Sequence, residues 1–408
     1  MSMGFINIVL LSLAYLITVR VLRYQRRDAI TRRYGLGGRQ GFKAMTLQNA
    51  HAIVLDLATL EFPQMFSGSI FFALFKTYGI PSISSLLAAT GQLAKDSTAS
   101  KRAADTGILI TEVVLNDPAS PRVVDGVARM NYLHGRYRKA GKITDDDMLY
   151  TLGLFALEPI RWNGKYDWRK LTDVEQCALG VFWKDMGEAM EITYDQLRPS
   201  TSSVFADGLD WLQALQAWCD QYEVDHMVPA VSNSKVSKAT LDIAVFNLPI
   251  RLRNTAVQFV SALLEPRLRR AMMLGTPPPS YSRIVTAILN LRKWFIRYAC
   301  PPRPEMLRTQ WFTKDKDIAT GRYFALRYIS HPWYVEPSLM SRWGPQALFT
   351  RLYGGVVPGD EGTKYHPEGY KITELGPTEL VGAGEQEMQR TRTQLNRRRG
   401  CPMGDTMY

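Results

Sequence analysis

The chain has 408 residues, of which 46% are apolar and 22% are charged, so it is not an intrinsically disordered protein. Four cysteines are too few for a disulfide-stabilised scaffold. Lys and Arg outnumber Asp and Glu by 50 to 38, a formal net charge of +12. Such a charge suits an anionic membrane, a nucleic acid or an acidic partner, and its position along the chain decides among them.

An uncharged apolar segment opens the chain. Residues 3–19 read MGFINIVLLSLAYLITV, 17 residues that extend about 25 Å as a helix. The side chain of Arg20 can reach water from inside the bilayer, which extends the apolar segment to residue 22. Because the ER bilayer is thinner than average, the sequence predicts a transmembrane anchor over residues 1–22.

The positive charge follows this segment. Residues 20–43 hold eight Arg or Lys and one Asp, whereas a cleaved signal peptide carries its charge before the apolar run. We therefore predict an uncleaved, single-pass anchor and a basic juxtamembrane segment at 23–42 that contacts anionic headgroups. The positive-inside rule places the body in the cytosol. No recognition motif accompanies the basic clusters, so nucleic acid is not expected as a partner.

The rest of the chain has the apolar periodicity of helices. Apolar residues recur every three or four positions over 171–186, which marks one buried helical face. The same pattern predicts helices at 44–60, 101–115, 123–139, 146–157, 204–222, 252–273 and 281–298. Gly, Pro, Glu and Lys dominate from residue 354 onward, and the periodicity fades. We predict an all-α protein with one large helical domain at 43–353 and an irregular, extended C-terminal tail at 354–408.

Two polar motifs indicate the starts of helices. Thr172 and Glu175 have the spacing of a capping box. Asp145, Asp146 and Asp147 precede an apolar run, where the helix dipole favours carboxylates. We therefore interpret the three aspartates as a helix start and not as a metal site.

Common catalytic signatures are absent from the sequence. It contains no H-E-x-x-H, no G-x-S-x-G, no phosphate-binding loop and no C-x-x-C pair. The five histidines, none of them paired at ligand spacing, are His51, His134, His226, His331 and His366. This argues against a His-rich non-haem metal site, but a haem needs only one good axial ligand.

Residues 128–153 are the most unusual stretch. On an unbroken helix Arg129, Tyr132 and Arg136 share one face, and His134 lies about 140° from Arg129. A large ligand could use His134 for a metal and an arginine for its carboxylates if Arg129 reaches round the helix. The alternative is a core histidine with surface arginines, which the spacing alone favours.

Glu112 is the second unusual residue. It lies in the otherwise apolar run GILITEVVL at 107–115, where a carboxylate is costly to bury unless it is paired or protonated. Perturbed carboxylates cluster at functional sites. A glutamate at a helix edge that reaches solvent is the alternative.

Several long segments resemble one known family. They are RMNYLHGRYRKAGKITDDDMLYTLGLFALEPIRW at 129–162, LTDVEQCALGVFWKDMGEAM at 171–190, and further segments at 60–87, 321–329 and 342–370. Together they resemble the ER-bound oxygenase mpaB family, the fungal branch of the rubber oxygenase (latex clearing protein) group. The resemblance covers roughly residues 60–370, and the N-terminal anchor fits it.

The resemblance implies a haem-dependent oxidoreductase at the ER membrane. It implies an all-helical body with one b-type haem, and O2-dependent cleavage of a C=C bond in an isoprenoid chain. The substrate implied is a prenylated small molecule of fungal meroterpenoid or other secondary metabolism. The oligomeric state does not follow from it.

Site residues follow from the resemblance one by one. The arginine and histidine of the family's R-x-x-x-x-H pattern match Arg129 and His134, and the proposed acid/base glutamate matches Glu112. Relatives place their axial histidine on the next helix, where this chain has none, so the haem iron ligand is His134 or His331, or this branch lacks haem. We expect His134 as axial ligand, Arg129 with Arg136 at the haem propionates beside Tyr132, and Glu112 and Arg129 in catalysis.

Two other functions fit the same sequence. One is a haem-free, ER-anchored helical protein that binds lipid or acts as a scaffold, since no dense catalytic cluster is visible. The other is a non-haem iron oxygenase that uses His134 with Glu112 and another carboxylate. The visible absorption spectrum and the metal content of the purified protein distinguish all three.

Overall fold

The computed structural model describes residues 3–35, 38–91, 96–197 and 205–400, and helices make up nearly all of its regular secondary structure in these ranges. The helices are α1 (Met3–Tyr34), α2 (Arg39–Lys43), α3 (Leu47–Asp56), a π-helical turn (Leu57–Glu61), α4 (Pro63–Thr77), α5 (Pro81–Thr90), α6 (Asp96–Leu115), α7 (Pro121–Lys139), α8 (Asp145–Tyr166), α9 (Asp173–Ala189), α10 (Gly208–His226), α11 (Val231–Ala244), α12 (Ile250–Leu263), α13 (Pro266–Ala271), α14 (Pro279–Tyr298), α15 (Leu339–Trp343), α16 (Pro345–Leu352) and α17 (Glu385–Gly400). Short 3-10 turns lie at Asp195–Leu197, Glu305–Leu307, Ile372–Glu374 and Thr378–Leu380. Within these ranges, pairing of extended backbone is limited to two isolated bridges. The predicted all-α class is confirmed.

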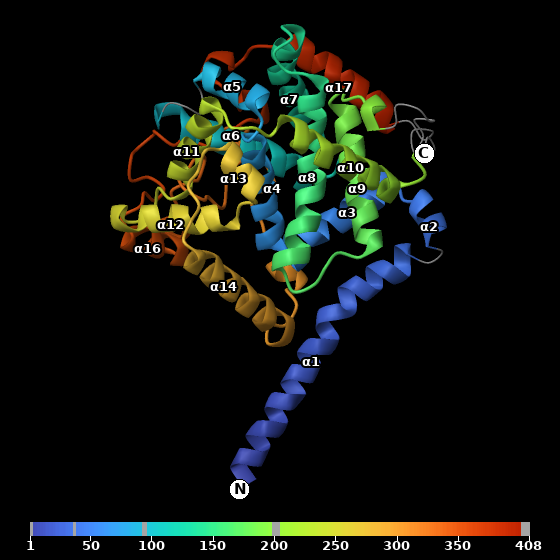
Figure 1. Cartoon of the computed structure of the whole chain (residues 1–408), viewed down its shortest axis with the longest axis vertical. Coiled ribbons are helices and arrows are strands. Elements are labelled where there is room, and N and C mark those ends of the chain that lie inside the picture. Colours follow the sequence, from blue (N-terminus) through green and yellow to red (C-terminus); the bar gives the residue numbers. More distant parts are fainter. Residues whose placement is uncertain (1–2, 36–37, 92–95, 198–204, 401–408) are drawn as a thin grey trace.

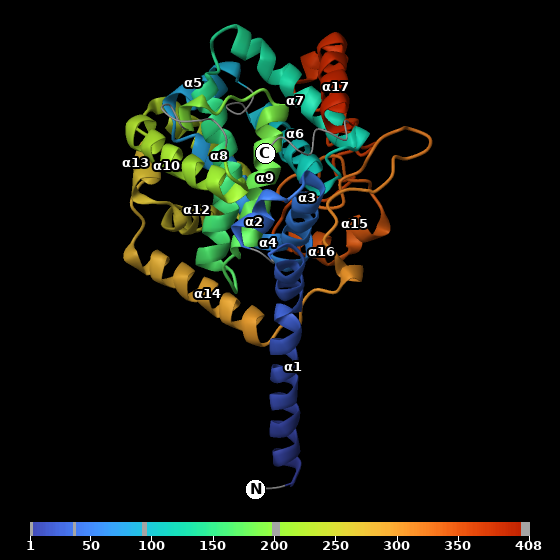
Figure 2. The ribbon, with the colours of Figure 1, turned by 90° about the vertical axis from the view of Figure 1, so that its right-hand side faces the viewer.

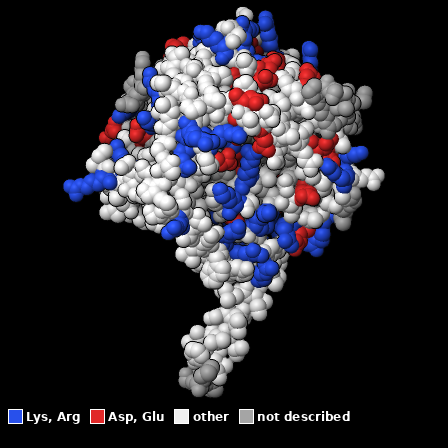
Figure 3. Space-filling view, viewed as in Figure 1, with Lys and Arg blue, Asp and Glu red and all other residues white. Residues whose placement is uncertain are grey.

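Helix α1 projects from the body as a long stem (Figures 1 and 2). It is 32 residues long, and only 6% of its most apolar window is buried. Among the described helices, α1 by itself is long and apolar enough to cross a membrane; α4 and α5 pass the same test only if they are taken as one bent span. Figure 3 shows the outer length of the stem without charge and Lys and Arg gathered where it meets the body. The predicted membrane-capable N-terminal helix is therefore present.

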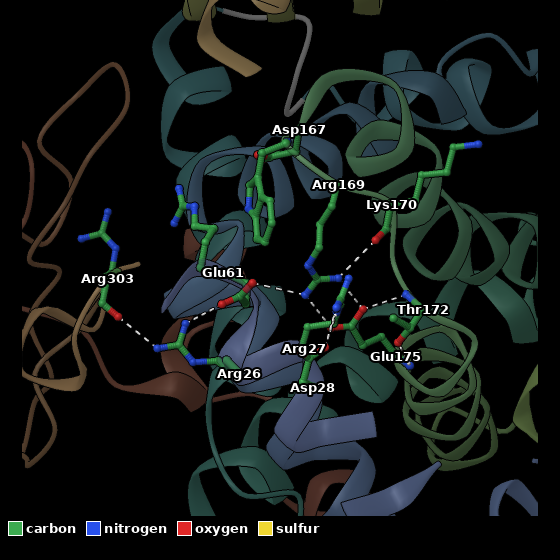
Figure 4. A network of polar contacts seen from close by, with 12 residues as sticks. Arg26, Arg27, Asp28, Glu61, Asp167, Arg169, Lys170, Thr172, Glu175 and Arg303 are labelled. Carbon is green, nitrogen blue, oxygen red and sulfur yellow. Dashed lines mark hydrogen bonds and ion pairs between the residues drawn. The ribbon is translucent and has the colours of Figure 1, made fainter. Parts of the chain in front are cut away.

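The inner end of α1 is tied to the body by buried ion pairs (Figure 4). Arg26 contacts Glu61 at 2.5 Å and donates to the carbonyl of Arg303. Glu61, on the π-helical turn, also accepts from Nη2 of Arg169, whose Nη1 and Nη2 both donate to Glu175 at 2.7 Å. Because this network joins α1 to the turn before α4 and to the start of α9, the stem and the body meet in a fixed arrangement.

The capping predictions are confirmed. Thr172 and Glu175 form the predicted capping box at α9. Thr144 caps α8, and the three aspartates fill its first turn. Within the described ranges, no group of three or more His, Cys, Asp or Glu side chains is placed to hold a metal ion.

Helix boundaries differ from the predictions where proline intervenes. The predicted helix at 252–273 is divided into α12 and α13, because Pro266 cannot donate a backbone hydrogen bond and begins a new helix instead. Helices α4, α5 and α11 were not predicted. In the C-terminal tail, residues 354–384 are mostly irregular as predicted, but α17 follows and packs along α7. The last eight residues lie outside the described part.

Candidate functional site

A cavity of about 260 Å³ lies between helices α4 to α9. Each helix contributes residues one turn apart, so the walls are the apolar faces that the sequence periodicity marks. The lining includes Leu74 of α4, Ile83, Leu86 and Leu87 of α5, Leu109, Ile110 and Val113 of α6, Met148, Leu152 and Phe155 of α8, and Trp183 and Met186 of α9. The walls therefore suit an apolar ligand. A smaller void of about 30 Å³, which includes Phe66 and Phe71, shares Leu74 and Ile110 with the main cavity.

Helix α7 brings His134 to this cavity. The α7 residues that line it are Met130, Leu133, His134 and Tyr137, at the spacing of one helical stripe. The Nδ1 atom of His134 is buried and has no hydrogen-bond partner. Burial, with Arg102 and Arg138 nearby, lowers the pKa of His134 to about 4. The ring is therefore neutral near pH 7 and keeps a nitrogen lone pair for a ligand.

Cationic and hydrogen-bonding groups also reach the cavity. Arg102 of α6 and the exposed Lys142 after α7 both line it. Arg102 donates a 2.5 Å hydrogen bond to Thr106, one turn further along α6. Trp183 stacks on Phe155 with ring centroids 5.3 Å apart, and its buried Nε1 has no partner. Sequence reasoning missed Arg102 and Lys142, although Arg102 shares the helical face of Leu109 and Val113.

Arg129 lies on the other side of α7 and does not line the cavity. Its guanidinium is fully buried and donates to the carbonyls of Leu375 (2.8 Å), Leu380 (3.0 Å) and Ala383 (3.3 Å). Residues 375–383, which we name the strap, place Pro377 and Leu380 on the cavity wall. Arg129 thus acts on the cavity through the strap, and the structure does not place it at a ligand's carboxylates.

Further contacts hold the strap. Asp105 accepts from the backbone N–H of Gly376 at 3.0 Å, and Lys101 donates to the carbonyl of Gly376. Just beyond the strap, Gly384 has φ +82° and lies against the ring of Tyr132, where a Cβ atom would approach a ring carbon to 2.2 Å. Tyr132 also lies under Arg129, whose guanidinium carbon is 5.4 Å from the ring centroid. Tyr132 therefore supports the strap, whereas Arg136 is exposed on α7.

We expect Arg129→Met to loosen the strap. The change leaves three carbonyls without their charged donor, and a hydrogen bond to a charged group contributes about 1.5–3 kcal/mol. Loss of even one such bond speeds local opening at least about tenfold, so backbone amides of residues 375–383 should exchange that much faster by hydrogen–deuterium exchange mass spectrometry. Arg136→Met, on the same helix but exposed, is the matched control. Equal exchange in both variants would contradict this role.

Glu112 is buried and paired. It lies 0% exposed and binds Arg122 through both carboxylate oxygens, at 2.5 and 2.6 Å. Asn116 donates to it at 2.7 Å, and the Tyr370 hydroxyl donates a further bond. Its neighbours Leu109, Ile110 and Val113 line the cavity, but Glu112 does not. The pairing that the sequence required for a buried carboxylate is present, and it ties α6 and α7 to Tyr370 before the strap.

His331 lies outside the cavity lining. Its ring stacks on Phe246 with centroids 3.9 Å apart, and its Nδ1 lies 3.1 Å from the hydroxyl of Ser330. Of the two candidate axial ligands, the structure therefore brings only His134 to the cavity. The free cysteines among the described residues are Cys177, Cys219 and Cys300, and none of them lines it.

Relatives with curated names are similar over most of the chain. An ER-bound oxygenase named mpaB′ from Penicillium brevicompactum is 40% identical over 394 residues, 96% of this chain and 92% of the relative. The ER-bound oxygenase mpaB of the same organism is 39% identical over 88% of this chain and 84% of the relative. The mpaB of Penicillium roqueforti is 42% identical over 64% of this chain and 88% of the relative. No protein-family profile matches the chain.

Proposed function

Because the chain belongs to the ER-bound oxygenase mpaB family, we propose that it is a membrane-anchored, haem-dependent oxygenase. The reaction is cleavage of a C=C bond in the isoprenoid side chain of a secondary metabolite. The observation that carries this proposal is the neutral imidazole of His134, with one buried and unpartnered nitrogen, in an apolar cavity. The printed names of the relatives support the oxygenase class.

The residues at the cavity fit a b-type haem by their chemistry. His134 would hold the iron, because haem iron takes a neutral imidazole as its axial ligand. Arg102 and Lys142 would bind the propionates, which need cations near water, in place of the arginines expected from the sequence. The apolar walls suit the macrocycle. The cavity volume of about 260 Å³ is just below the range of about 300–1,000 Å³ for drug-sized ligands, so a haem requires the walls to move apart.

The strap is the part of the wall best suited to such movement. Apart from the ten-residue α5, the other helical walls are long helices packed in the core, whereas the strap is a short segment held by side-chain contacts to its backbone. Release of these contacts opens one side of the cavity without disturbing α4 to α9. The strap then confines the ligand when the contacts form again.

A bound haem would supply O2 binding and activation. The chain's own residues bind and orient the reactants: the apolar faces of α4, α5 and α6 hold the isoprenoid chain, and the strap excludes water. In the overall reaction the C=C bond and the O–O bond break, and one oxygen atom goes to each carbon. The products are two carbonyl compounds, and neither an external reductant nor a proton is required. The observed pairing of Glu112 supports a role for this residue in positioning α6.

The proposed location is the ER membrane, with α1 as a single-pass anchor. Eight basic residues follow the apolar part of α1, and the positive-inside rule therefore favours a cytosolic body. A prenylated substrate partitions into the bilayer, so anchoring raises its concentration near the enzyme.

The test uses the full chain, expressed with added haem precursor and purified in lipid nanodiscs. We expect a Soret band and about one b-type haem per chain by the pyridine haemochromogen assay. Incubation with prenylated aromatic compounds under 18O2, followed by immediate borohydride reduction to prevent oxygen exchange, should give two products with one 18O each. A colourless protein without iron would contradict the proposal and indicate lipid binding. Iron without a porphyrin band would indicate a non-haem oxygenase.

A further inference from the structure

Helix α14 carries an exposed apolar stripe that no part of the described chain covers. The stripe consists of Ile284, Ile288, Leu291, Phe295 and Tyr298, at successive spacings of four, three, four and three residues. Leu291 is 67% exposed and Ile288 is 58% exposed, and Trp294 beside them is 58% exposed. Exposed apolar residues in such a regular row mark an interaction surface.

The other faces of α14 have different roles. Val285, Leu289 and Ile296 are half-buried and lie about 100° to 140° round the helix from Ile284 at 100° per residue, so they form the face toward the body. The remaining face holds Thr286, Asn290, Lys293 and Arg297. The helix contains four basic residues and no acidic one. An apolar stripe beside a basic polar face is typical of helices that lie in the membrane interface.

Helix α14 is joined to the membrane-capable helix. The hydroxyl of Tyr15 donates to the carbonyl of Ala299 at 2.8 Å, and Arg23 donates to the carbonyl of Ile296 at 3.1 Å. These contacts fall near the end of the apolar part of α1, where it would leave the bilayer. Figures 1 and 2 show α14 running away from α1 across the underside of the body instead of following the stem. The C-terminal end of α14 is therefore held at the depth of the membrane surface.

A second exposed apolar area lies in the same half of the body. Leu339, Met340, Trp343, Phe349 and Leu352 of α15 and α16 are 57% to 84% exposed. Figures 1 and 2 place α16 in the half of the body from which α1 emerges. Both apolar areas thus lie on the side of the body from which the anchor emerges (Figures 1 and 2).

We propose that α14, together with α15 and α16, rests in the interface of the bilayer, so that the body is seated on the membrane and not merely tethered to it. This rests on the proposed anchoring by α1. Arg292 contacts Asp167 and Gln64 of the body. The other basic residues of α14 bind anionic headgroups, and its apolar stripe enters the boundary between headgroups and acyl chains. The lipid surface is a continuation of the contact that α1 makes, which is why we assign it as the partner and not a second copy of the chain.

Tryptophan fluorescence in lipid vesicles tests this contact between the body and the bilayer interface. Helix α1 contains no tryptophan, so quenching by lipids brominated near the headgroup must come from the body. We expect full-length protein in vesicles of phosphatidylcholine and phosphatidylserine to be quenched, and Trp294→Phe to lose a measurable share of that quenching. Ile288→Glu/Leu291→Glu should lose the same share, because two carboxylates on the stripe lift α14 from the lipid.

The matched control is Thr286→Glu/Asn290→Glu, which adds the same charge on the polar face, away from the stripe, and should keep more of the quenching than the stripe variant does. Equal quenching of the wild type, Trp294→Phe and the stripe variant would overturn the proposal. So would stripe-dependent cross-linking of two chains without quenching, which would indicate a dimer. Vesicle flotation distinguishes failure of the anchoring proposal from failure of the interfacial proposal. If the wild type does not float with the vesicles, the anchoring by α1 is wrong. If it floats without quenching, only the proposed interfacial contact of α14, α15 and α16 is wrong.

Discussion

His134→Ala protein is expected to be purified without haem. Because the imidazole of His134 alone among the five histidines lines the cavity, its removal leaves no axial ligand there, and both the Soret band and C=C cleavage should be lost. Truncation to alanine leaves room for a free imidazole molecule, so added imidazole should restore part of the absorbance. The measurements are the visible spectrum and the pyridine haemochromogen assay on protein purified with haem precursor.

His331→Ala is the control for this experiment. The His331 ring packs against Phe246 outside the cavity lining, so this variant should retain its haem. Circular dichroism should show the same helix content in both variants. Full haem in His134→Ala together with haem loss in His331→Ala would assign the axial position to His331 instead.

Arg122→Met is expected to destabilise the protein by about 3–5 kcal/mol, the usual cost of removing one partner from a buried ion pair. Glu112 is 0% exposed, so its carboxylate would then keep only the Asn116 and Tyr370 hydrogen bonds. The Glu112→Gln/Arg122→Met double variant should recover part of this loss, because no uncompensated charge remains. Urea unfolding of the haem-free protein in detergent measures all four members of the double-mutant cycle.

Turnover distinguishes the two roles of Glu112. If Glu112 positions α6, the Glu112→Gln variant should be less stable, but folded protein with haem should cleave substrate at a rate near that of the wild type. Loss of cleavage in a variant that is folded and haem-loaded would instead support the acid/base role expected from the family resemblance. If the stability changes of Glu112→Gln and Arg122→Met simply add in the double variant, Glu112 and Arg122 are not a coupled ion pair.

Local patterns predicted much of the fold. The apolar periodicity around Val181 identified α9, and the capping box at Thr172 identified its first turn, because both signals depend on residues a few positions apart. The spacing also gave the angular separation of His134 from Arg129, which the two faces of α7 reproduce, whereas the choice of His134 as a ligand came from the family resemblance. These are properties of one helix.

The partners of Arg129 could not be predicted from such patterns. Its guanidinium binds the carbonyl of Leu375, 246 residues further along the chain, and carbonyl acceptors have no sequence signature. The pairing of Glu112 with Arg122 illustrates an intermediate case, because the ten-residue separation crosses the turn between α6 and α7. Helix α17 was missed because it has few apolar residues and packs through Met388 and Leu395.

The position of the strap in the chain has a consequence for biosynthesis. The helices that wall the cavity end with α9 at Ala189, whereas the strap begins about 190 residues later. At translation rates of about 5–20 residues per second, about 10–40 s pass before the strap is made. With α1 as the proposed anchor, the wall helices leave the ribosome first and close to the membrane, while one side of their cavity has no cover. A large ligand therefore enters the cavity most easily during synthesis, before the strap has been made. The strap then covers the cavity once it has been synthesised.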